Sequence, residues 1–367
     1  MDQLSLPGTP ARPRVLSVIG ARPEIIQAAP VCEALAPLVD EILVHTGQHY
    51  DDAMSGNQIL ATQLPRPDHN LEVGSRGREE QVELAQERLE ELIERERPNV
   101  VIVRGDTNAT LSGARAAVAA DVPLVHVEAG LRSHRDDMPE EYNRIETDRL
   151  SQVLCAPTEG ARANLESEGV TGVVHVTGDP LCDMLERWRP RVHPAGDGDY
   201  VLATIHRNYN TDDPARLAQV LECLDRSELP VIMPLHPRTR ARIEQWELEV
   251  PAGIELAEPV PYTRMLELER GAAAIATDSG GVQREAYLWG VRCLTLREET
   301  EWIDTVSAGW NTLVGVDPDA FEAALRAPAP AARPEIFGDG RAAERIARIV
   351  ATLAGAQQAL HGTEVVA

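Results

Sequence analysis

The chain contains no lysine, and all 35 of its basic residues are arginine. Its 59 acidic residues outnumber them and give a formal net charge of −24 at pH 7. Nucleic-acid binding needs clustered positive charge, and anionic lipid likewise attracts basic segments. We therefore expect neither a nucleic acid nor a membrane surface as a partner. The acidic balance favours solubility, in high salt for example.

Cysteine, phenylalanine and long apolar runs are also scarce. With only two Phe residues, Leu, Val, Ile and Ala must fill the core. The five cysteines are dispersed and form no CxxC motif, which indicates free thiols in a reducing cytoplasm. No apolar run approaches the ~18 residues of a membrane span, and the N-terminal MDQLSLPGTPARPR has no signal-peptide core. These absences predict a cytosolic protein.

A length of 367 residues predicts two domains, because one core rarely grows beyond about 250–300 residues. Short β-branched runs alternate with helical patterns, which is typical of parallel sheets covered by helices on both faces. The first series predicts strands at 14–19, 41–45, 99–104, 122–127, 152–155 and 173–176, with helices at 23–38, 52–61, 78–97, 107–120, 141–151 and 158–168. The second predicts strands at 200–205, 230–235, 253–257, 272–276, 292–296 and 312–315, with helices at 212–227, 237–248, 261–270, 280–289 and 317–326.

The segment RWRPRVHPAGDGDY (187–200) interrupts this alternation with Pro, Gly and charge. We place the domain boundary there. The predicted α/β fold consists of a Rossmann-like domain over 14–188, a second over 199–340, and a long amphipathic helix over 341–360.

Three carboxylates stand out, two of them at the ends of predicted strands. The run VVIVR leads into Asp106, the run VPLVHV leads into Glu128, and Glu140 follows shortly after. In an open parallel sheet, neighbouring strands deliver their carboxyl ends to one crevice, where ligands bind. With Arg132 and Arg144 nearby, the trio suits proton transfer on a bound polar substrate.

The run TDSGGVQREA follows another predicted strand. Asp278 or Ser279 can cap the helix that begins here, and Gly280 and Gly281 let a ligand approach backbone N–H groups. A helix N-terminus is suited to phosphate, and Glu285 lies one turn further, where it can hold ribose hydroxyls. An ordinary capped helix explains the same residues.

The run VLSVIGARPE has a comparable turn, with Gly20 ending a strand and Pro23 fitting the first turn of a helix. Arg22 is then placed as a clamp for phosphate or carboxylate. A surface arginine at a helix start is the alternative.

His206 and His236 each end a predicted strand of the second half, and arginine follows each. A lone histidine is usually structural, but two at equivalent strand ends favour a functional role for His206 and leave His236 open. Either can titrate near neutrality. HTGQHYD has two histidines after a strand, but neither HExxH nor a Cys/His set is present, so we expect no metal and no cofactor. Gln48 lines either the crevice or a solvated loop.

Together these segments resemble the non-hydrolysing UDP-N-acetylglucosamine 2-epimerase family over nearly the whole chain from Arg14. The resemblance rests on GARPE, HTGQHYD, RGDTNAT, HVEAGLRS, PEEYNR, HR after a strand, TDSGGVQREA and TLREETEW. It implies the GT-B architecture, with a UDP-sugar in the cleft between two Rossmann-like domains. It also implies a homodimer and a C-terminal helix that crosses back to the first domain.

Carried over residue by residue, the resemblance implies that Asp106, Glu128, Glu140 and His206 are catalytic. It implies diphosphate contacts at Arg22, Ser279, Gly280 and Gly281, and a ribose contact at Glu285. Gln48 matches a position at which some bacterial relatives bind a second UDP-N-acetylglucosamine as activator. The implied reaction is anti elimination of UDP to a 2-acetamidoglucal, followed by re-addition after C2 is protonated from the opposite face.

Three departures from the family pattern bear on substrate and activity. Gln27 replaces a common lysine, Tyr209 replaces a glutamate, and TEWIDTV replaces the more familiar TERPEGV. The last, with GARP and LHPRTR, resembles the branch that acts on UDP-2,3-diacetamido-2,3-dideoxy-glucuronic acid. A GT-B glycosyltransferase, a hydrolysing epimerase and a non-catalytic sugar-nucleotide sensor are rival functions for a chain with these features.

Overall fold

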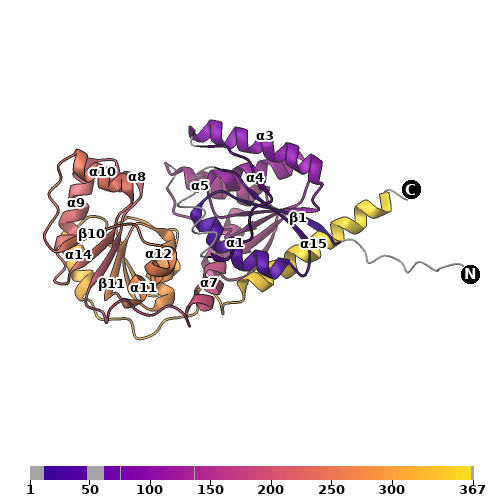
Figure 1. Cartoon of the computed structure of the whole chain (residues 1–367). Coiled ribbons are helices and arrows are strands. Elements are labelled where there is room, and N and C mark those ends of the chain that lie inside the picture. The colour runs from indigo at the N-terminus through magenta and orange to yellow at the C-terminus, as the bar shows by residue number, and fades with distance from the viewer. Residues whose placement is uncertain (1–11, 48–61, 75, 136, 365–367) are drawn as a thin grey trace, which may run out of the picture.

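The structure is a computed structural model that describes residues 12–47, 62–74, 76–135 and 137–364 (Figure 1). Its N-terminal half is built on a seven-stranded sheet in the order β3-β2-β1-β4-β5-β6-β7, in which every pairing is parallel. The strands are β1 (Arg14–Ile19), β2 (Asp40–His45), β3 (His69–Asn70), β4 (Val100–Arg104), β5 (Leu124–Val127), β6 (Val153–Ala156) and β7 (Val173–Val176). The helices are α1 (Arg22–Leu35), α3 (Arg78–Glu96), α4 (Asn108–Ala119), α5 (Pro139–Leu150), α6 (Glu159–Glu168) and α7 (Pro180–Trp188).

The C-terminal half repeats this plan with a six-stranded parallel sheet in the order β10-β9-β8-β11-β12-β13. Its strands are β8 (Val201–Thr204), β9 (Val231–Pro234), β10 (Ile254–Ala257), β11 (Ala274–Thr277), β12 (Arg292–Thr295) and β13 (Asn311–Leu313). Its helices are α8 (Asn208–Thr211), α9 (Pro214–Asp225), α10 (Pro237–Gln245), α11 (Tyr262–Gly271), α12 (Gly280–Trp289), α13 (Ile303–Ser307) and α14 (Pro318–Arg326). Both strand orders are those of doubly wound sheets, so the predicted α/β class with two Rossmann-like units is confirmed.

Several elements differ from the prediction. Helix α7 was not predicted, although Asp179 caps it by accepting a hydrogen bond from Leu181 N (2.9 Å) and Pro180 fits its first position. Elements β3, α8 and α13 were not predicted either, because they are too short to show a periodic pattern. Helix α5 begins at Pro139, so Glu140 lies in its first turn. The predicted helix 52–61 lies outside the described residues.

The last helix, α15 (Ala342–Glu364), packs against the N-terminal half (Figure 1). Its small and branched residues share a buried cluster with residues of β1, α1 and β4, namely Ala343, Ile346, Ala347, Val350 and Ala354 with Val15, Val31, Val100 and Ile102. Asp183 of α7 fixes its start by accepting hydrogen bonds from Ala342 N (3.0 Å) and Ala343 N (2.9 Å). Burying the apolar stripe stabilises this return of the chain.

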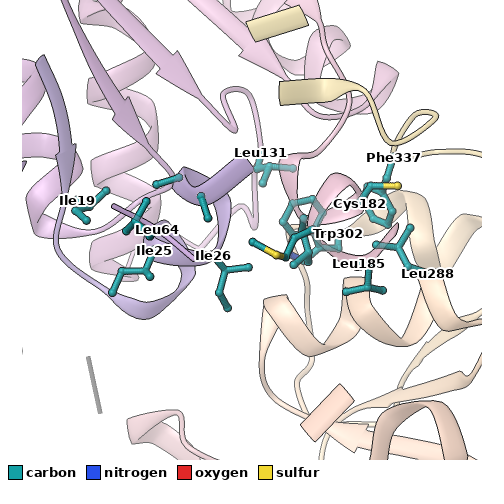
Figure 2. Packing of buried hydrophobic residues seen from close by; sticks show 14 of the residues in the cluster. Ile19, Ile25, Ile26, Leu64, Leu131, Cys182, Leu185, Leu288, Trp302 and Phe337 are labelled. Carbon is teal, nitrogen blue, oxygen red and sulfur yellow. The ribbon is translucent and has the colours of Figure 1, made fainter. Parts of the chain in front are cut away.

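A second apolar cluster joins the two halves (Figure 2). It combines Ile25, Ile26, Cys182 and Leu185 from the N-terminal half with Tyr262, Leu288 and Trp302 from the C-terminal half, and with Phe337 from the segment before α15. The rings of Trp302 and Phe337 meet edge to face with centroids 5.7 Å apart. This shared core holds the polar residues of the two halves in reach of one another.

Within the described part of the chain, no helix combines the length and apolar character needed to cross a membrane.

Candidate active site

Asp106 and Glu128 lie at the same edge of the first sheet. The ends of β4 and β5 are in register, with Arg104 opposite Val127, and each carboxylate follows its strand within two residues. Glu128 has φ +71°, a left-handed conformation that non-glycine residues rarely adopt. Backbone strain of this kind costs about 1–3 kcal/mol and clusters at functional sites.

Asp106 is held by residues of α5. Its carboxylate pairs with Arg144, and its backbone oxygen accepts a hydrogen bond from Asn143 Nδ2 (2.9 Å). Arg144 is buried, bonds Glu141 (2.9 Å) and lies 3.7 Å from Glu301 of the other half. Burial alone would lower the pKa of Arg144, but these acids raise it, so it remains a fixed cation beside Asp106.

Glu128 is the most buried of the three predicted carboxylates, with 9% of the residue exposed. Its Oε2 accepts hydrogen bonds from Gln27 Nε2 and from Arg284 Nη1 (2.6 Å). Burial raises the pKa of Glu128 to about 7; the charge of Arg284 opposes this rise, and Asp179 and Asp106 add to it. A carboxyl with this pKa can hold or release a proton near neutrality.

Glu140 forms an ion pair with an arginine of the C-terminal half. It lies in the first turn of α5 and pairs with Arg207 Nη1 (2.8 Å), which follows β8. The backbone N–H of Arg207 donates to Asp278 Oδ2 (2.9 Å), and Asp278 follows β11. Segments after the carboxyl ends of strands in both sheets therefore meet at this point.

The two predicted histidines have different surroundings. His206 donates its backbone N–H to both carboxylate oxygens of Asp278 (3.1 Å each), and its Nδ1 lies 3.2 Å from Oδ1. Half of its side chain is exposed (51%). His236 caps α10, where its Nδ1 accepts a hydrogen bond from Arg238 N (3.2 Å). Partial burial and the charge of Arg238 lower the pKa of His236, so it is neutral at pH 7 and the structure gives it a capping role.

The start of α12 lies beside the segment that contains Glu301 and Trp302. Ser279 is the residue that caps it, accepting a hydrogen bond from a first-turn N–H (3.5 Å). A Cβ atom on Gly280 would lie 2.5 Å from Glu301 Oε1 and 2.8 Å from Trp302 Nε1, so this position admits only glycine without a shift. A Cβ atom on Gly281 would meet nothing closer than Ser279 Oγ at 3.7 Å.

Glu24 connects the GARPE turn (residues 20–24) to the segment after β4 through hydrogen bonds. Its carboxylate accepts hydrogen bonds from Gly20 N (2.6 Å), Ala21 N (2.7 Å), and the hydroxyls of Thr107 (2.6 Å) and Thr110 (2.9 Å). These contacts fix the backbone at the start of α1, where Arg22 is the first residue. The Arg22 side chain and all of Gln48 lie outside the described part of the structure.

Two residues predicted to bind substrate are engaged in other contacts. Buried Arg132 pairs with Asp148 (2.8 Å) and Glu168 (2.7 Å), so we leave it out of the proposed site. Its partners lie in helices, and helix packing of this kind cannot be foreseen from spacing. Glu285 is buried and accepts a hydrogen bond from Tyr262 OH (2.8 Å). Across the described residues, no three His, Cys, Asp or Glu side chains are grouped so as to hold a metal ion.

Arg284 and Arg207 are not among the site residues predicted from the sequence, although each is next in the chain to one that is, Glu285 and His206. Arg284 bonds Glu128 and Asp179 (2.7 Å) and stacks over Trp302, with its guanidinium carbon 4.1 Å from the ring centroid. Its place one helical turn after Gly280 was a usable signal, since the two share a helix face. Nothing local indicated that it reaches Glu128.

The chain is similar to known proteins over most of its length. A family model described as UDP-N-acetylglucosamine 2-epimerase matches residues 34–351. The UDP-2,3-diacetamido-2,3-dideoxy-D-glucuronate 2-epimerase of Pseudomonas aeruginosa is 39% identical, over 93% of this chain and 100% of that protein. The crystal structure of Methanocaldococcus jannaschii UDP-GlcNAc 2-epimerase in complex with UDP-GlcNAc and UDP matches with a TM-score of 0.83 and 36% identity, over 92% of this chain and 99% of that one.

A spinosyn rhamnosyltransferase shares only the fold, with a TM-score of 0.52 and 15% identity over 96% of this chain and 99% of that one. The predicted GT-B-like architecture is therefore confirmed.

Proposed function

The chain belongs to the UDP-N-acetylglucosamine 2-epimerase family of isomerases, and from this premise we propose that it inverts C2 of a UDP-linked 2-acetamido sugar, converting UDP-N-acetylglucosamine to UDP-N-acetylmannosamine. The observation that carries the proposal is that Asp106, Glu128 and Glu140 each pair with an arginine, from one half or the other. The charge of Asp106 acts on both Glu128 and Arg207, the arginine that pairs with Glu140. The M. jannaschii relative crystallised with UDP-GlcNAc and UDP supports the same substrate class.

The chemistry requires a proton to leave C2 and to return on the opposite face. The C2 proton of a neutral acetamido sugar is not acidic enough for simple abstraction, so the reaction proceeds by elimination. A carboxylate takes the C2 proton, C1 and C2 form a double bond, and the C1–O bond breaks with its electron pair leaving on UDP. Protonation of C2 from the other side and re-addition of UDP at C1 give the epimer.

The surroundings of the three carboxylates suit both proton-transfer steps. Asp106 and Glu140 have 23% and 32% of their side chains exposed, so they can contact a bound sugar. Glu128, with its pKa raised by burial to about 7, is able to carry a proton at neutral pH. Groups with a pKa near the working pH are the most effective acid–base catalysts. We assign the three as the proton-handling set, with His206, the chain neighbour of Arg207, as a fourth catalytic residue.

The start of α12 is the proposed diphosphate site. Ser279 and the backbone N–H groups of Gly280 and Gly281 present donors and the positive end of a helix dipole. The family resemblance also implies a diphosphate contact at Arg22, the first residue of α1. These groups stabilise the charge that develops on UDP as the C1–O bond breaks.

The test is NMR of the protein with UDP-N-acetylglucosamine in heavy water. We expect the manno epimer to form with deuterium at C2. Epimer without deuterium at C2 would refute the proton-exchange mechanism. Free N-acetylmannosamine with UDP would indicate a hydrolysing enzyme, transfer to an acceptor sugar would indicate a glycosyltransferase, and tight binding without exchange would indicate a sensor.

A second candidate substrate is UDP-2,3-diacetamido-2,3-dideoxy-glucuronic acid. The P. aeruginosa relative, named for this substrate, is 39% identical over its full length, and the TEWIDTV segment points to the same branch. Parallel assays of the two UDP-sugars in heavy water decide between them by the ratio of kcat/KM. We further propose that the protein acts as a homodimer, which sedimentation equilibrium tests directly.

A further inference from the structure

Gln27 contacts Glu128 from the buried face of α1. Only 2% of Gln27 is exposed, and its Nε2 donates a hydrogen bond to Glu128 Oε2. Its Oε1 is buried and has no hydrogen-bond partner among the residues that the structure describes. A buried amide with an unused acceptor is costly unless a donor is available at some stage. The adjacent carboxyl becomes such a donor when it is protonated.

A glutamine suits both charge states of its neighbour. The amide NH₂ donates to an ionised carboxylate, and the amide oxygen accepts from a protonated one. Because the two ends of the amide have nearly the same shape, a rotation exchanges these roles without repacking. A lysine in the same place could only donate and would favour the ionised form.

The other groups around Glu128 do not have this property. Arg284 is a permanent cation whose charge is shared with Asp179, and its position is fixed by Trp302 and by a bond from its Nε to Gly280 O (3.3 Å). The charges of Asp179, Asp106 and Arg144 also act on Glu128, but within the described residues the hydrogen bonds to its carboxylate come from Gln27 and Arg284.

We propose that Gln27 is a positioning residue whose side-chain amide keeps Glu128 able both to take up and to release a proton in the epimerisation cycle. This inference rests on the proposed function, in which Glu128 must return to its starting state after every turnover. It also accounts for a glutamine at this buried position, since an ionised partner for Glu128 is already supplied by Arg284.

The direct test is infrared titration of the Glu128 carboxyl in the full-length protein, with the Glu128→Gln variant used to identify its band. For the wild type we expect a midpoint near neutrality. Gln27→Lys should lower the midpoint by at least about one pH unit, because an opposite charge within hydrogen-bonding distance lowers a carboxyl pKa by about 1–3 units. Gln27→Leu should raise it, because burial then acts without the amide.

Gln152→Lys is the matched control. Gln152 bonds Leu124 N (2.7 Å) at the amino end of β5, whereas Glu128 follows the carboxyl end of the same strand. The substitution changes the net charge equally but at a separation of about 13 Å along the strand, beyond a Debye length of about 8 Å. The Glu128 midpoint should remain that of the wild type. Equal midpoints in Gln27→Lys and wild type would overturn the proposal.

The pH profile of C2 deuterium exchange supplies the functional measurement. The profile of Gln27→Lys should shift in the same direction as its infrared midpoint; a shifted midpoint with an unshifted profile would also overturn the proposal. If Gln27→Lys fails to fold, the Gln27→Leu titration decides the question, since an unchanged midpoint there is equally contradictory. Absence of exchange in the wild type would instead refute the proposed function, and the infrared titration would still test the contact between Gln27 and Glu128.

Discussion

Replacing Gly280 or Gly281 by alanine adds the same methyl group at two adjacent positions with different surroundings. At Gly280 the new carbon would lie 2.5 Å from Glu301 Oε1 and 2.8 Å from Trp302 Nε1. Glu301 is held by Arg297 (2.9 Å), and Trp302 is packed in the cluster that joins the halves, so neither neighbour moves freely. At Gly281 the nearest atom would be 3.7 Å away.

The expected magnitude follows from these distances. Overpacking of a filled site costs about 1–3 kcal/mol. Alanine in place of glycine also stabilises a helix, by up to about 1 kcal/mol. Both glycines lie in the first turn of α12, so the propensity gain is common to the two variants and cancels in their difference. Gly280→Ala should therefore be less stable than Gly281→Ala by about 1–3 kcal/mol.

Urea unfolding of both variants and the wild type, followed by circular dichroism, measures this difference. Gly281→Ala should be as stable as the wild type or slightly more stable. Equal unfolding free energies for the two variants would show that the segment with Glu301 and Trp302 does not press on the helix start. The packing argument for a glycine at 280 would then be wrong.

Three further predictions concern single side chains. Asp106→Asn should lower the rate of C2 exchange by about 100-fold or more while the circular dichroism spectrum remains that of the folded wild type; near-native exchange would remove Asp106 from the site. Burial raises the pKa of Asp183 to about 6, so its stabilising contribution is complete below the unfolded pKa of 3.8 and is lost as pH rises through 6. The loss of unfolding free energy between about pH 4 and about pH 7, measured with urea, should be larger by about 2 kcal/mol in the wild type than in Asp183→Asn. Other buried acids with a raised pKa, such as Glu128, contribute equally to both proteins, and equal losses in the two would contradict the prediction. Arg132→Lys should lower stability by breaking the two-bond contact with Glu168 while leaving KM unchanged; a raised KM would return Arg132 to the substrate site.

Much of the fold followed from local patterns. Parallel strands were predicted from β-branched runs, and the residues that follow each run were predicted to lie at the carboxyl ends of the strands. Asp106 and Glu128 were placed at one sheet edge because strands β4 and β5 are neighbours in a doubly wound order. Helix α7 was not predicted, because its nine residues run directly into the Pro- and Gly-rich segment 187–200, where the alternation of strands and helices is interrupted.

The sequence by itself determined the alternation of strands and helices, the acidic surface, and the residues that end each strand, because these depend on neighbours a few positions apart. Only the tertiary structure decided which residues that are distant in the sequence come into contact. Arg284 and Glu128 are 156 positions apart and Gln27 and Glu128 are 101 apart, yet they share one carboxylate oxygen. The same packing occupied Arg132 in a structural ion pair. The contact of Arg284 with Glu128 arises because the two halves dock through a common apolar core. The contacts of Gln27 and Arg132 arise from the packing of helices within the first half, and no local pattern encodes either kind of packing.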